Sequence, residues 1–317
     1  MSLPRQAHVA DLFARAGMPL VLVLLFAGCA LGVENFLTVA NLRGLALAVS
    51  MTGMVACTMM FCLAAGDFDL SIGSVVACAG VIAAVVMNRA GVAAGVASAI
   101  AFGAFVGLLN GFVVARLGVN ALITTLASMQ VVRGLAFIVS GGSAVGIAAE
   151  PFFALGNGAF GGVPVPVWIT AACFIGAGFV LNRTVFGRDT LAVGGNAEAA
   201  RLAGINVARL KVAIFGAQGA MAALAGVVLA SRVTSGQPNT SVGFELEVIS
   251  ACVLGGVSLS GGIARISHVL SGVLILGVVQ NAMNLLNVPT FWQYVARGLI
   301  LLGAVLLDRW KLGRVRG

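Results

Sequence analysis

The sequence predicts an all-α integral membrane protein with about ten transmembrane helices. Of its 317 residues, 60% are hydrophobic and 9% are charged, whereas soluble domains carry about 25% charged residues. Apolar runs of about 20 residues, long enough to cross the hydrocarbon core, recur along the whole chain. A soluble domain must cover its surface with polar groups, so cytosolic enzymes and secreted disulfide scaffolds are excluded.

The apolar runs are bounded by charges, by Gly or Pro clusters or by Asn. In order along the chain, Arg15 precedes the first run, Arg116 ends the fourth, Arg183 ends the sixth and Arg209 precedes the seventh. The predicted spans are 17–33, 45–65, 71–87, 91–115, 120–140, 164–182, 210–231, 245–261, 264–283 and 292–308.

The run near 245–262 is unusual, because two glutamates lie at its start and two Gly-Gly pairs lie near its end. We therefore expect a broken or re-entrant segment there. The membrane domain covers 17–308, between a cytoplasmic tail of 1–16 and a basic cytoplasmic tail of 309–317.

Basic residues predict the orientation, because Lys and Arg resist translocation and collect in cytoplasmic loops. Ten spans place both termini on one side, and thirteen of the 18 Lys and Arg residues fall on that side. The opposite loops hold only Arg43, Arg89 and Arg232. Both termini are therefore expected in the cytoplasm. A nucleic-acid partner is not expected, because the basic residues lie singly between apolar runs and are not gathered on one face.

No motif for catalysis or for a cofactor is found in the sequence. Lys211 and Lys311 are the only lysines, and neither belongs to a phosphate-binding loop. The six cysteines lack the spacing of a metal site. We therefore expect neither an enzyme nor a metal or cofactor on this chain.

The longest polar stretch on the expected cytoplasmic side is 183–211. Asn196 is a good N-cap, Glu198 complements a helix N-terminus, and Gly204 can end a helix in the left-handed conformation. Gly194 and Gly195 are expected to form a flexible connection before Asn196. The sequence thus predicts one short helix outside the membrane.

Glu198-Ala199-Ala200, followed by Gly204 and then by Ile214, resembles the EAA–G signature of ATP-binding-cassette (ABC) importer permeases. In that family this loop is a coupling helix that sits in a cleft of the ATPase subunit. The family's usual Leu-Pro after the Ile is absent, which points to a particular branch. The residues to which the resemblance gives a coupling role are Gly195, Asn196, Glu198, Ala199, Ala200 and Gly204.

Residues 66–73, 121–127 and 234–262 look like the hallmarks of the ribose, xylose and arabinose importer permeases, and the resemblance covers 15–310. Details such as 281–287 look most similar to the L-arabinose branch. The resemblance implies a multi-pass homodimer in a bacterial inner membrane, surrounded by lipid. A periplasmic binding protein would deliver the sugar, and ATP and Mg²⁺ would bind a separate ATPase subunit.

Ionisable groups within a bilayer cost about 2.5–3.5 kcal/mol each on insertion scales, so each requires a partner or a watery cavity. Asp67 and Asp69 precede the span that starts at Ser71. Two roles would explain these carboxylates. They could cap the span at its cytoplasmic end, or they could line the inner mouth of a transport pathway.

Two arginines, Arg133 and Arg297, lie in Arg-Gly-Leu within apolar runs. One of them is expected to pair with Glu245 or Glu247 in the outer half of the membrane, as a structural bridge or as a gate. A sugar pathway is expected to be lined by uncharged polar and aromatic side chains. The candidates, each of which also suits a helix–helix hydrogen bond, are Asn110, Asn120, Thr124, Thr125, Gln130, Gln237, Asn239, Asn281, Asn284, Gln293 and Tyr294.

Two pseudo-symmetric halves are suggested by the likeness of 66–73 to 255–262. Alternatives remain open at this point. The cargo of the same class of transporter could be ribose, xylose, galactose, a furanosyl signal or a branched-chain amino acid. A different class, an ion-gradient-driven secondary transporter, would use Asp67 or Asp69 as its ion site.

Overall fold

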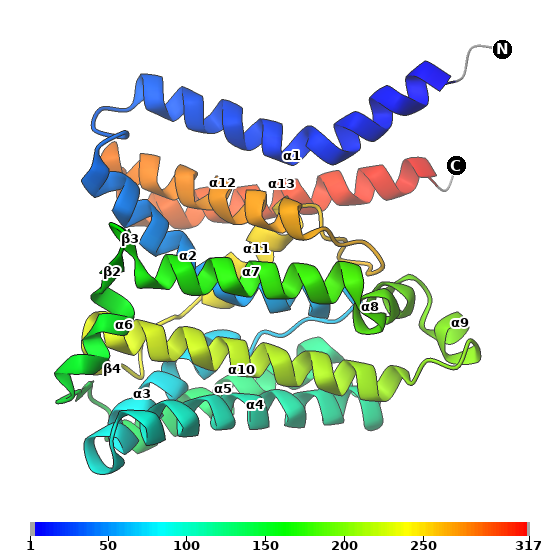
Figure 1. The fold of residues 1–317 in the computed structure, drawn as a ribbon. Coiled ribbons are helices and arrows are strands. Elements are labelled where there is room, and N and C mark those ends of the chain that lie inside the picture. Colours follow the sequence, from blue (N-terminus) through cyan, green and yellow to red (C-terminus); the bar gives the residue numbers. More distant parts are fainter. Residues whose placement is uncertain (1–3, 316–317) are drawn as a thin grey trace.

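The computed structural model describes the backbone of residues 4–315 and the side chains of residues 17–306. Within this part the chain is a bundle of helices with four two-residue strands (Figure 1). The long helices are α1 (Pro4–Gly32), α2 (Val39–Ala64), α3 (Ile72–Ala90), α4 (Val92–Arg116), α5 (Ala121–Ser140), α7 (Val165–Arg183), α10 (Val207–Val233), α12 (Ile266–Leu285) and α13 (Thr290–Val315). The short elements are β1 (Val145–Gly146), η1 (Glu150–Phe153), α6 (Ala154–Asn157), β2 (Ala159–Phe160), β3 (Val163–Pro164), α8 (Val185–Gly195), α9 (Ala197–Leu202), β4 (Ser235–Gly236) and α11 (Phe244–Leu254).

Seven of these helices, α2, α3, α4, α5, α7, α10 and α12, are long and apolar enough to cross a membrane. Three further predicted spans fall on α1, α11 and α13. The apolar parts of α1 and α13, Gly17–Gly32 and Thr290–Leu306, are shorter than the seven, and α11 has 11 residues. The expected all-α membrane class is confirmed.

The helices alternate in direction, which gives the bundle two ends. At one end, called the α9 end, α8 and α9 project from the bundle, and α1 begins and α13 ends there (Figure 1). At the other end, called the β4 end, β4 pairs with β1 and β2 pairs with β3. The elements between α5 and α7 therefore lie at the β4 end.

Helices α2, α3 and α10 form the buried centre, whereas α4, α5 and α7 lie at the periphery. Helix α4 packs on α10 through glycines spaced by four, Gly103, Gly107 and Gly111. A Cβ atom at Gly107 would overlap the carbonyl of Phe215, so the two backbones are in direct contact. Small residues allow such close approach, which drives helix association where the hydrophobic effect is weak.

The chain crosses the bundle between β4 and α12 without a continuous helix. After β4 it runs back along α3, because Gly236 lies against Gly80 and Ser241 lies against Gly73. Helix α11 then runs from Phe244 to Leu254. An irregular segment leads from there to α12, which begins at the α9 end. The expected break is found, because α11 ends at Leu254 and irregular backbone leads from there to α12, and the segment passes from one end of the bundle to the other (Figure 1).

The irregular backbone before α11 is supported by an arginine. Arg133 of α5 donates through Nη1 to the carbonyls of Pro238 and Thr240, both at 2.7 Å. Within a bilayer an unpaired carbonyl costs several kcal/mol, so irregular segments require partners of this kind. Arg133 thus holds the backbone, which is a role that the expected arginine–glutamate pairing did not include.

Candidate functional site

The stretch 183–211 contains two helices rather than one, α8 and α9. Asn196 separates them and caps α9, accepting a hydrogen bond at Oδ1 from the Ala199 N–H at 2.9 Å. Gly204 follows α9 with a φ of 90°, in the left-handed region. The predicted cap and the predicted left-handed ending are confirmed.

The prediction of a flexible connection at Gly194 and Gly195 is wrong. Both residues belong to α8, and Gly194 lies against the carbonyl of Ala64 and the N–H of Gly262. A Cβ atom at Gly194 would overlap the Ala64 carbonyl, so glycine is required for close packing rather than for flexibility.

Helix α9 is exposed along most of its length. Of its six residues only Ala200 is buried, and Leu202 is 81% exposed. Glu198 and Arg201 form an exposed ion pair at 2.6 Å. The described packing of this chain thus leaves the Leu202 side chain uncovered.

Behind α9, three segments meet at the α9 end. Lys211, in the first turns of α10, forms an ion pair with Asp67 at 2.8 Å, in the connection between α2 and α3. The N–H of Gly262 donates to the carbonyl of Ala64 at 2.9 Å. The segment that carries α9 is thus joined to the end of α2 and to the segment that follows α11.

Asp69 organises the start of α3, outside the helical spans. Its Oδ1 accepts hydrogen bonds from the N–H and the hydroxyl of Ser71, at 2.9 and 2.6 Å. The Asn110 amide donates to the Ser71 hydroxyl at 3.1 Å. Burial raises the pKa of Asp69 to about 6, although the Ser71 hydrogen bonds oppose this shift. Burial also raises the pKa of Asp67, against the opposing effect of Lys211.

A cavity of about 420 Å³ lies between α2, α11 and α12. Its lining runs from Gly44 and Asn284, near the β4 end, to Thr52 and Glu247 near the start of α11. Cavities of roughly 300–1,000 Å³ hold small molecules in many proteins. Polar groups reach it from Thr52, Glu247, Gln280, Asn281 and Asn284.

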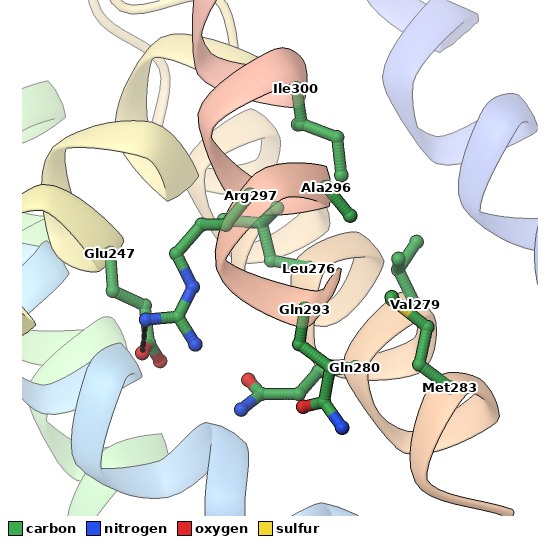
Figure 2. A pocket seen from close by; sticks show the side chains of 9 residues that line it. All are labelled: Glu247, Leu276, Val279, Gln280, Met283, Gln293, Ala296, Arg297 and Ile300. Atoms are coloured by element: carbon green, nitrogen blue, oxygen red, sulfur yellow. Dashed lines mark ion pairs between the residues drawn. The ribbon is translucent and has the colours of Figure 1, made fainter. Parts of the chain in front are cut away.

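A second hollow of about 20 Å³ adjoins this cavity on the side of α13 and shares Glu247 and Gln280 with it. Arg297 Nη1 lies 3.2 Å from Glu247 Oε2. In the same hollow, the polar ends of Arg297, Gln293 and Gln280 point toward one shared space (Figure 2). Thr52 donates to Glu247 Oε1 at 2.6 Å. The expected pairing of one arginine with one glutamate is therefore found between Arg297 and Glu247.

Other amides of the lining bond to neighbouring helices. Asn281 exchanges two hydrogen bonds with Asn41, at 2.7 and 3.0 Å. Gln293 donates to Asn284 at 2.8 Å. The predicted residues that the structure brings together around these two hollows are Glu247, Asn281, Asn284, Gln293 and Arg297, with the Tyr294 ring centroid 6.0 Å from the Arg297 guanidinium.

Sequence reasoning missed Thr52 and Gln280, although Gln280 lies one helical turn before Asn284 and that spacing indicates a shared face. The remaining predicted residues lie elsewhere. Asn120 caps α5, while Gln130 and Asn239 are exposed away from the cavity. Outside the cavity lining lie Asp67, Asp69, Ser71, Asn110, Asn120, Thr124, Thr125, Gln130, Arg133, Gln237, Asn239 and Glu245.

The chain is similar to known permeases along nearly its whole length. It is 62% identical over 296 residues to the L-arabinose transport system permease protein AraH of Escherichia coli (strain K12), covering 93% of this chain and 90% of the relative. It is 53% identical over 307 residues to the L-arabinose ABC transporter permease protein AraH of Azospirillum brasilense, with 96% and 91% covered.

A more distant relative is the ribose import permease protein RbsC of Escherichia coli (strain K12), at 39% identity over 282 residues, 87% of this chain and 88% of that protein. No solved structure matches the chain. The family described as branched-chain amino acid transport system / permease component matches residues 14–305. The chain therefore belongs to this family of permease components.

Proposed function

We propose that the chain is the membrane permease subunit of an ABC importer that carries L-arabinose into the cytoplasm. The observation that carries this proposal is the 62% identity to an L-arabinose permease over 93% of the chain. Identity to the ribose permease is 39%, so the similarity favours L-arabinose over ribose as the cargo.

In this proposal α9 is the coupling helix, and an ATPase subunit that binds ATP and Mg²⁺ receives it. Three features support the assignment: the exposed Ala199, the exposed Leu202, and the sharp ending at Gly204. Small side chains permit close approach to a cleft, and an exposed leucine gains by burial in a partner. Nucleotide-driven closure of the ATPase pair would move α9 and switch the pathway between two states.

The proposed topology has ten crossings, with α1, α13 and the broken segment around α11 added to the seven long helices. The α9 end faces the cytoplasm, since most Lys and Arg residues fall on that side of the predicted topology. The β4 end faces the periplasm, where a sugar-binding protein docks. Two copies of the chain form the pathway in the inner membrane.

The test is the uptake of labelled L-arabinose, ribose, xylose, galactose and leucine by the source cell, with and without this chain. The expected result is the loss of L-arabinose uptake alone. Loss of a different solute would correct the cargo and retain the importer. Proteoliposomes distinguish the class of transporter, because L-arabinose transport by the purified chain without an ATPase would indicate an ion-gradient-driven carrier instead.

A further inference from the structure

The cavity between α2, α11 and α12 contains polar groups that the protein itself leaves available. The described part of the chain offers no hydrogen-bond partner to the Gln280 amide, which points into the hollow beside Arg297 (Figure 2). A primary amide has two donors and one acceptor oxygen. A polar group at this depth gains by binding a ligand that both donates and accepts hydrogen bonds.

The charges at the base of the cavity favour a neutral ligand. Glu247 and Arg297 pair with each other at 3.2 Å, and Thr52 donates to the same carboxylate at 2.6 Å. A zwitterionic ligand such as an amino acid would have to break this pair in order to use both charges, whereas a hydroxyl can join it. The arginine keeps further N–H groups, and each carboxylate oxygen keeps a lone pair.

An aromatic side chain completes the lining. Phe244, the first residue of α11, borders the cavity near Glu247. An aromatic ring suits the apolar C–H face of a sugar, while the polar groups suit its hydroxyls. The lining thus combines one apolar surface with donors and acceptors that carry no net charge.

From this arrangement we propose that the cavity is a binding site within the permease for a neutral polyhydroxylated ligand of monosaccharide size. Gln280 and the Glu247–Arg297 pair bind its hydroxyls, and Phe244 contacts its apolar face. The site deepens the proposed function, on which it rests, because it assigns the contacts that a sugar makes inside this subunit after it leaves the binding protein.

The first test measures protection of a thiol in the complete complex, reconstituted in sealed proteoliposomes with its ATPase and binding protein. Five of the six native cysteines are buried and Cys173 is half-buried, so an Ala48→Cys variant has little background labelling by a membrane-impermeant thiol reagent. Ala48 lines the cavity, and the proposal gives it no contact with the ligand. A Ser143→Cys variant, at an exposed position near the β4 end, is the control.

Binding protein loaded with L-arabinose is compared with the same amount of empty binding protein. We expect labelling of the Ala48→Cys thiol to slow by about threefold once the site is about two-thirds occupied, and labelling of the Ser143→Cys thiol to stay unchanged. Equal rates for loaded and empty binding protein, in a parent complex that transports L-arabinose, would overturn the site and leave the permease assignment intact. A parent complex that takes up no L-arabinose would instead contradict the proposed function.

The second test compares two replacements of glutamine by leucine. Gln280→Leu should lower the maximal rate of L-arabinose uptake by about tenfold, because the variant loses one hydrogen bond to the sugar. The amount of the variant protein in the membrane should stay normal. Gln218→Leu is the matched control, because Gln218 is fully buried in α10 and its amide has no partner among the described residues. Parental uptake in Gln280→Leu, or equal losses in both variants, would refute the site.

Discussion

The ion pair between Asp67 and Lys211 allows a quantitative test of how the α9 end is held together. The two charges lie 2.8 Å apart, and their side chains are 10% and 19% exposed. At an effective dielectric constant of about 20, their attraction is about 6 kcal/mol. Burial nevertheless raises the pKa of Asp67, and Lys211 opposes this rise without reversing it.

The expected stabilities follow from this balance. Asp67→Asn or Lys211→Met alone leaves one buried charge without its partner. Each single variant should lose about 3 kcal/mol of the free energy of unfolding. This value is at the low end for buried pairs because Lys211 retains some exposure. The double variant removes both charges and should lie within about 1 kcal/mol of the parent. The coupling energy in the double-mutant cycle, which is the sum of the two single losses minus the loss of the double variant, is therefore expected to be about 5–7 kcal/mol.

The assay is thermal unfolding in detergent, followed with a dye that reacts with thiols, since Cys57, Cys62 and Cys252 are buried in the folded chain. A loss of about 3 kcal/mol corresponds to a fall in Tm of about 5 °C or more for a chain of this size. Lys211→Met should lose less at low pH, because protonation neutralises the unpaired Asp67 carboxyl. A double variant that loses as much as both single variants together would refute the reasoning.

The remaining predictions concern the start of α3, the α4–α10 contact and α9. Because the pKa of Asp69 is raised to about 6, its contribution to stability is largest below about pH 4 and decreases by about 3 kcal/mol as the pH rises through 6. Asp69→Asn should therefore reduce the fall in Tm between pH 4 and 7, and Asp67, whose pKa is also raised, should account for the part that remains. Gly107→Val should lower the Tm by several degrees, because the new side chain overlaps the Phe215 carbonyl, whereas an unchanged Tm would contradict this contact. Glu198→Lys or Gly204→Asp should abolish uptake at normal membrane levels, and uptake that survives both changes would exclude α9 as the coupling helix.

The sequence was informative wherever composition or local chemistry decides the outcome. Apolar runs predicted the membrane helices, because a bilayer imposes a minimum length on each one. The cap at Asn196 and the left-handed Gly204 were predicted because both depend on residues within one turn. Helix α8 was missed because Gly194, near its end, packs against Ala64 and Gly262, which are distant in sequence.

The candidate site was predictable only in part for the same reason. Charges in apolar runs require partners, so a glutamate partner for Arg297 could be inferred, and Glu247 supplies it. Arg133 instead binds two backbone carbonyls, and no sequence pattern marks a carbonyl that lacks a partner. Gln280 was missed because hydropathy alone does not distinguish a glutamine that faces a cavity from one that faces a neighbouring helix.

The broken segment around α11 also determines how this chain can be assembled. With 11 residues α11 rises about 16 Å, roughly half of the hydrocarbon thickness, so it cannot enter the lipid as an independent helix during synthesis. The carbonyls of Pro238 and Thr240 find their donor on α5, which is made about a hundred residues earlier. Protein rather than lipid has to surround this segment, so we expect it to take its place only after α5 has supplied the donor for these carbonyls.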